Sequence, residues 1–115
     1  MKKLWKSFGY SFNGLAYAFR TQLNFRLHCV STVLVVLLGL YVHLSTTEWL
    51  WVSLAIALVM ASELINTAIE VLVDLVSPEW NDKAGKVKDV ASAAVLIMGL
   101  LALVIALFIF VPKLS

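Results

Sequence analysis

Long apolar segments alternate with short polar ones along the chain, and three of them are long enough to cross a membrane. The hydrocarbon core of a bilayer is roughly 30 Å thick, so a helix needs about 20 mostly apolar residues to span it. The sequence predicts transmembrane helices over residues 27–43, 49–76 and 88–111. The uncharged stretch of the third, residues 90–111, is roughly 33 Å long as a helix, a full crossing.

Two polar connections separate these spans. The first, residues 43–48, is short, and either Thr46 or Thr47 is expected to cap the helix that follows, without a full capping box. The second, residues 77–82 (SPEWND), contains proline and several turn-forming residues and predicts a break between helices.

The first 25 residues predict a different kind of helix, with an apolar stripe and basic flanks. The stripe recurs at spacings of three and four and consists of Trp5, Phe8, Phe12, Leu15 and Phe19. An aromatic-rich stripe of this kind is typical of a helix lying in the plane of the lipid headgroups. The same face can instead pack against the other helices, and both interpretations remain open.

Composition excludes a soluble monomer, a disordered tail and a nucleic-acid-binding module. Apolar residues make up 62% of the chain and charged residues 14%, and the mean hydropathy is +0.94. Ordinary globular chains have roughly 45–50% apolar and roughly 25% charged residues. The basic residues lie in residues 2–26 and 83–88, with Lys113 as the exception. The positive-inside rule then predicts a cytoplasmic N-terminus and an external C-terminus.

The second span carries a polar face. At 100° per residue, Glu63, Asn66, Glu70 and Asp74 share one arc of the helix. Such an arc cannot face lipid, because each ionised carboxylate near the bilayer centre costs roughly 2.5–3.5 kcal/mol even on a lenient scale. Counting about 20 residues from Trp49 places the arc at the cytoplasmic edge of the membrane. Lipid hydroxyls and cytosolic nucleotides meet at this depth.

These residue types suit phosphoryl transfer. Carboxylate and amide oxygens are ligands for Mg²⁺, and a carboxylate beside a hydroxyl can act as its general base. Lys88 and Asp89 follow at the start of the third span, and lysine beside metal-binding acids suits a polyphosphate. The alternative is that the polar groups join helices together, with basic neighbours satisfying the acids.

Two motifs stand out around the polar face: residues 63–70 (ELINTAIE) followed by Asp74, and residues 84–95 (AGKVKDVASAAV). Upstream support comes from residues 9–15 (GYSFNGL) and 24–28 (NFRLH). On these residues the chain resembles the prokaryotic diacylglycerol kinase family, which includes the undecaprenol kinases of Gram-positive bacteria. It covers essentially the whole chain. It implies an all-α homotrimer in the bacterial plasma membrane, with active sites shared between subunits. It also implies transfer of the ATP γ-phosphate to a lipid hydroxyl.

The resemblance also implies roles for individual residues. Glu63 matches the general base and Glu70 a Mg²⁺ ligand. The positions that match groups near the nucleotide are Tyr10, Ser11, Asn66, Asp74, Lys88 and Asp89. Where many members have a glutamate as the second metal ligand, this chain has Gln22, which removes one negative charge. We expect weaker or differently ordered metal binding as a result.

The preference for one lipid substrate over another is inferred from the family resemblance alone. Asn24, Arg26 and His28 resemble the Gram-positive pattern, which slightly favours undecaprenol over diacylglycerol. His28 fits either a substrate contact or a hydrogen bond at a helix end. Two other classes of protein remain as alternatives. One is a small multidrug or proton-coupled transporter that uses intramembrane carboxylates, and the other is a passive assembly subunit.

Overall fold

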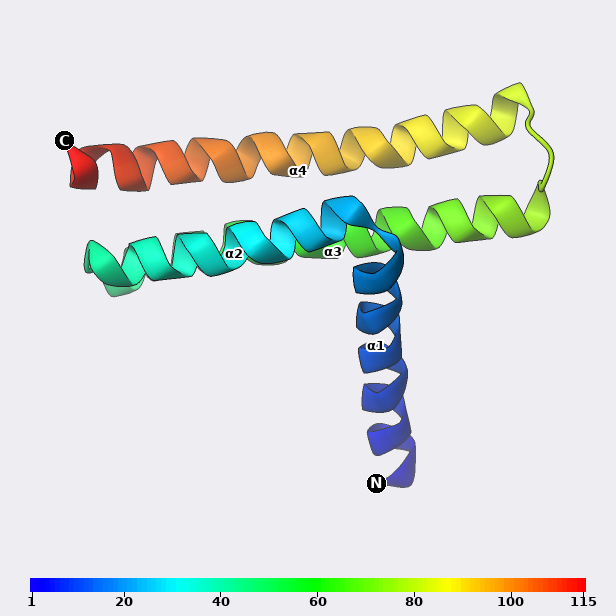
Figure 1. Cartoon of the computed structure of the whole chain (residues 1–115), viewed down its shortest axis with the longest axis horizontal. Coiled ribbons are helices and arrows are strands. Elements are labelled where there is room, and N and C mark those ends of the chain that lie inside the picture. Colours follow the sequence, from blue (N-terminus) through cyan, green and yellow to red (C-terminus); the bar gives the residue numbers. More distant parts are fainter.

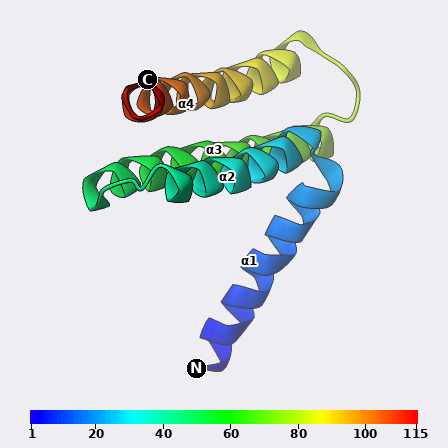
Figure 2. The ribbon, with the colours of Figure 1, turned by 60° about the vertical axis from the view of Figure 1, so that its left-hand side comes forward.

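The fold is entirely helical. The computed structural model describes all 115 residues and contains four helices: α1 (Lys2–Thr21), α2 (Leu23–Tyr41), α3 (Thr46–Val76) and α4 (Asp82–Leu114). Helices α2, α3 and α4 run alongside one another, and α1 leaves the bundle at a large angle (Figures 1 and 2). The last three helices are long and apolar enough to cross a membrane, which confirms the three predicted spans.

A sharp corner joins α1 to α2. Gln22 adopts an extended backbone conformation, with φ −116° and ψ 110°, and ends α1 before the expected boundary at residue 25. The Nη1 atom of Arg26, in the first turn of α2, donates to the carbonyl oxygens of Phe19 at 2.8 Å and Arg20 at 3.0 Å. These carbonyls belong to the last turn of α1 and have no partner within the helix. Arg26 therefore stabilises the corner.

The connection between α2 and α3 corrects one prediction. The N-cap of α3 is Ser45, not Thr46 or Thr47, and a full capping box is present. Ser45 Oγ accepts from the backbone N–H of Glu48 at 3.2 Å, and the Ser45 N–H donates to Glu48 Oε1 at 2.9 Å. This box satisfies donors that a helix N-terminus otherwise leaves free. His43, just before it, has a positive φ of 58°.

The predicted break after the second span is confirmed. Helix α3 ends at Val76, and α4 begins at Asp82 with Asn81 as its N-cap. Asn81 Oδ1 accepts from the Ala84 N–H at 2.9 Å, and its Nδ2 donates to Ser77 Oγ at 2.6 Å. The single residue Asn81 therefore both starts α4 and closes the loop.

The apolar core lies at the end of the bundle opposite this loop, where α3 begins and α4 ends. Its buried members are Leu44, Val52, Ala55, Ile105, Ile109 and Phe110. Lys113 Nζ also lies 3.1 Å from Glu48 Oε1 at this end. Most other large apolar side chains are exposed on the isolated chain, as expected for surfaces that contact lipid or further protein.

Candidate active site

The buried carboxylate of Glu63 is the central feature of the acidic arc. Its side chain, on α3, is 5% exposed. His28 Nε2, on α2, lies 3.2 Å from Glu63 Oε1. Thr67, one turn further along α3, donates to the backbone carbonyl of Glu63 at 2.9 Å and leaves the carboxylate untouched. An ionised carboxylate at such a position is costly unless it has a partner, and His28 supplies one.

Asn66 and Glu70 form a second pair one turn further along α3. Asn66 Nδ2 donates to Glu70 Oε1 at 3.1 Å. The other polar atom of the amide, Oδ1, is buried and has no hydrogen-bond partner. A buried amide oxygen without a partner is unusual in proteins and calls for an explanation.

A third pair links α3 to α4. Lys88 Nζ lies 2.6 Å from Asp74 Oδ1, and the two side chains are 40% and 66% exposed. Both residues, with Asp89 and Gly85 from the start of α4, line a polar hollow under the loop that contains Trp80. Along α3, the polar face therefore changes from the buried Glu63 to the exposed Asp74, which lies beside the polar hollow.

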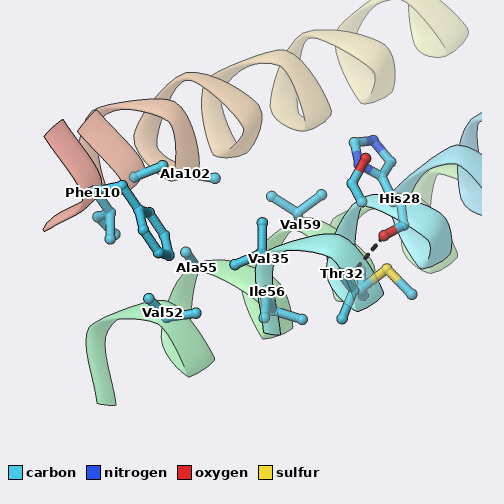
Figure 3. A pocket seen from close by; sticks show the side chains of 13 residues that line it. His28, Thr32, Val35, Val52, Ala55, Ile56, Val59, Ala102 and Phe110 are labelled. Atoms are coloured by element: carbon cyan, nitrogen blue, oxygen red, sulfur yellow. Dashed lines mark hydrogen bonds between the residues drawn. The ribbon is translucent and has the colours of Figure 1, made fainter. Parts of the chain in front are cut away.

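An apolar cavity of about 110 Å³ lies between α2, α3 and α4. Figure 3 shows His28 at one end of this cavity and Phe110 towards the other. Between them its walls are almost entirely apolar, with Val35, Val59 and Ala102 among the lining residues. His28 thus contacts both the buried carboxylate and an apolar space within the bundle.

The remaining predicted site residues lie apart from these pairs. Tyr10 is 71% exposed on α1. Ser11 donates to the backbone carbonyl of Ser7 and lines a hollow between α1 and α3 that also includes Thr67. Gln22 is at the α1–α2 corner, where its Nε2 lies 3.5 Å from Thr21 Oγ1. Within one chain, no three His, Cys, Asp or Glu side chains converge as a metal site.

Sequence reasoning did not find the contact between His28 and Glu63. A signal for it exists in the spacing, because α2 and α3 are antiparallel neighbours joined by the short connection 42–45. Residues at comparable distances from such a connection lie at the same level of the two helices. His28 lies 13 residues before the end of α2 and Glu63 lies 17 residues after the start of α3, so their levels differ by about one helical turn. The role of Arg26 at the α1–α2 corner was missed as well.

The fold and the polar pairs define a class of protein: a small helical protein with three helices long and apolar enough to cross a membrane, and with a buried acid and further acids along one face of α3. Residues 9–110 match the family model of prokaryotic diacylglycerol kinase. The chain is 36% identical to the undecaprenol kinase of Bacillus subtilis (strain 168), over 99% of this chain and 93% of that protein. It is 33% identical to the diacylglycerol kinase of Escherichia coli (strain K12), over 86% and 81%.

A third relative, the diacylglycerol kinase of Synechocystis sp., is 38% identical over 94% of this chain and 62% of its own length. The chain belongs to the prokaryotic diacylglycerol kinase family. It is an integral membrane lipid kinase, a phosphotransferase with an alcohol group as acceptor. The transporter alternative is not favoured.

Proposed function

We propose that this lipid kinase transfers the γ-phosphate of Mg-ATP to the hydroxyl of a membrane lipid, with undecaprenol slightly favoured over diacylglycerol. The match to the Bacillus subtilis undecaprenol kinase over 99% of this chain supports the preference. The observation that carries the proposal is the buried Glu63 carboxylate, above two further polar pairs on the same face of α3.

Glu63 acts as the general base. Its carboxylate is shielded from water, so it can accept the proton of a lipid hydroxyl while the hydroxyl oxygen attacks the γ-phosphorus. The bond from the γ-phosphorus to the β,γ-bridging oxygen breaks, and ADP leaves. Positioning and charge neutralisation supply most of the catalysis in such transfers.

Asp74, Lys88 and Asp89 bind the nucleotide in the polar hollow at the end of α3. Lys88 is a compact cation suited to a phosphate oxygen. Its contact with Asp74 is partly exposed and therefore weak, so Lys88 can exchange Asp74 for a phosphate at little cost. Tyr10 and Ser11 lie apart from this hollow within one chain, so they would complete the site from α1 of a neighbouring subunit.

Glu70 and Asn66 fit a magnesium ion. The unpartnered Oδ1 of Asn66 is a hard oxygen ligand beside the Glu70 carboxylate, which accounts for an otherwise unexplained buried atom. Gln22 is the third candidate ligand, with an amide oxygen in place of a carboxylate. When bound, Mg²⁺ neutralises charge on the phosphates.

The chain functions as a homotrimer with active sites shared between subunits. The exposed apolar faces of the isolated chain, and the separation of Gln22 and Tyr10 from the α3 pairs, support this proposal. In the bacterial plasma membrane, the N-terminus and the active site face the cytoplasm and the C-terminus lies outside. Helix α1 then lies in the headgroup plane, in keeping with its large angle to the bundle (Figure 2).

The test is transfer of label from γ-labelled ATP in mixed micelles, with undecaprenol and diacylglycerol in parallel and with or without Mg²⁺. Glu63→Gln keeps the shape of the side chain and removes its basicity, so turnover should fall by about 10²–10⁴-fold while nucleotide binding persists. Glu48→Gln is the matched control, because it makes the same change at the opposite end of α3. The capping box is retained, since either glutamine or glutamate can accept the Ser45 N–H hydrogen bond.

Three outcomes would contradict the proposal. Full turnover by Glu63→Gln would remove Glu63 as the base. Label in diacylglycerol alone would reverse the lipid preference. Equal losses in Glu63→Gln and Glu48→Gln would show a general effect on the fold.

A further inference from the structure

We infer that His28 is a positioning residue for the carboxylate of Glu63, an inference that rests on the proposed role of Glu63 as the base. The separation of 3.2 Å between His28 Nε2 and Glu63 Oε1 is that of a close polar contact between an imidazole nitrogen and a carboxylate oxygen. The contact joins two helices, α2 and α3, so it fixes the carboxylate relative to a second element of the bundle.

No other side chain of this chain makes a polar contact with that carboxylate. The neighbours on α3 are engaged elsewhere, because Asn66 donates to Glu70 and Thr67 donates to the Glu63 backbone carbonyl. Ser62, the adjacent hydroxyl, donates to the Val59 carbonyl. His28 is therefore the one polar side chain of this chain in contact with the Glu63 carboxylate, and it contacts only one of the two carboxylate oxygens.

The second oxygen, Oε2, is the one left to accept the proton of the lipid hydroxyl. A base that engages its substrate through one oxygen must have that oxygen aimed correctly, and small misplacements of reacting groups cost up to about 10²-fold in rate. Thr32 donates to the His28 backbone carbonyl at 2.7 Å and therefore does not compete for the imidazole. Its side chain is 34% exposed and lines the apolar cavity (Figure 3).

His28 lies between an apolar cavity and the Glu63 carboxylate. The cavity that His28 lines is mostly apolar, which suits a lipid chain. The Glu63 carboxylate contacts Nε2 of the same imidazole. The imidazole holds the base in place without itself taking the proton in this scheme.

The kinetic test uses His28→Ala, His28→Gln and the control His43→Asn in the full-length protein, with undecaprenol in mixed micelles. His28→Ala should lower kcat about 10–100-fold and leave the KM for ATP within about twofold, because the nucleotide hollow lies elsewhere. His28→Gln keeps an N–H donor and should recover a large part of kcat. His43 is the other histidine, exposed and at positive φ, which asparagine tolerates, so His43→Asn should match the parent protein.

A double-mutant cycle separates positioning from a structural role. Glu63→Asp retains a carboxylate but shortens the side chain, so it moves the carboxylate away from His28. Adding His28→Ala to Glu63→Asp should then lower kcat by less than twofold, because coupled residues are strongly non-additive. If the two losses multiply instead, or if His28→Ala alone retains kcat within twofold, the inference is overturned.

A spectroscopic measurement is independent of activity. With ¹⁵N-labelled histidine, the Nε2 resonance of His28 should move in Glu63→Gln and stay unchanged in Glu70→Gln, which alters the next acid along α3. An unchanged His28 resonance in Glu63→Gln overturns the contact itself. Failure of the proposed base is distinct from both results, because it appears as full turnover in Glu63→Gln with His28 intact.

Discussion

The close approach of α2 to α3 at the end of the bundle remote from the acidic arc can be tested with Gly39→Ala. A Cβ atom at Gly39 would lie 2.6 Å from Cη2 of Trp49 and 2.9 Å from Cδ1 of Leu44. Carbon atoms in favourable contact are about 3.5–4.0 Å apart, so the indole ring or the helix must move. Overpacking of this kind costs about 1–3 kcal/mol.

Gly99→Ala provides a matched control in α4. A Cβ atom there meets no heavy atom within 4 Å. Replacing glycine by alanine within a helix gains about 1 kcal/mol in either case, so this contribution largely cancels when the two variants are compared. The difference of about 1–3 kcal/mol between their free energies of unfolding then measures the steric cost at Gly39 alone.

The assay is unfolding in mixed micelles by titration with sodium dodecyl sulfate, followed by far-ultraviolet circular dichroism. Gly39→Ala should unfold at lower detergent fraction than Gly99→Ala. Adding Trp49→Phe to Gly39→Ala should restore part of the loss, because phenylalanine lacks the ring that carries Cη2. Equal free energies of unfolding for Gly39→Ala and Gly99→Ala would refute the close approach of Gly39 to Trp49.

Two further predictions concern Ser45 and Gln22. Ser45→Ala removes the acceptor for the Glu48 N–H and should lower the free energy of unfolding by about 1 kcal/mol, whereas Ser45→Asp keeps an acceptor and should lose little. The same detergent titration measures both variants. An unchanged free energy of unfolding in Ser45→Ala would show that the capping box contributes nothing to stability. Gln22→Glu introduces a negative charge at this candidate metal ligand, so it should lower the Mg²⁺ concentration that gives half-maximal turnover. An unchanged Mg²⁺ dependence would remove Gln22 from the metal site.

The sequence predicted the long helices well because hydropathy over many residues is a strong signal. Three apolar spans and the break at residues 77–81 agree with the structure. The corner at Gln22 was harder to locate, since no glycine or proline marks it and the hydrogen bonds that stabilise it come from Arg26, in the next helix. The capping box was within reach, because Ser45 and Glu48 have the required spacing.

The acidic arc was predicted from helical periodicity alone, but its pairing was not. Periodicity places Glu63, Glu70 and Asp74 on one face, and it says nothing about which residues of other helices face them. The structure brings in His28 from α2 and Lys88 from α4, and it leaves Asn66 and Glu70 as a pair within α3. Such contacts depend on the relative depth of neighbouring helices, which the packing of the whole bundle determines.

The two ends of the bundle are held together by different forces, and this difference bears on function. Apolar packing joins α3 to α4 at one end, and removal of its members is costly because buried side chains contribute about 1.5–3 kcal/mol each. At the other end the link between these helices includes the exposed pair Asp74–Lys88, and such pairs contribute about 0–1 kcal/mol. The residues proposed to bind phosphate therefore stabilise the free protein less than the packed core does. If the proposed exchange of Asp74 for a phosphate on Lys88 takes place, the apolar packing at the other end of the bundle would stay intact. Nucleotide binding would then reorganise the proposed site without unfolding the helices that position Glu63.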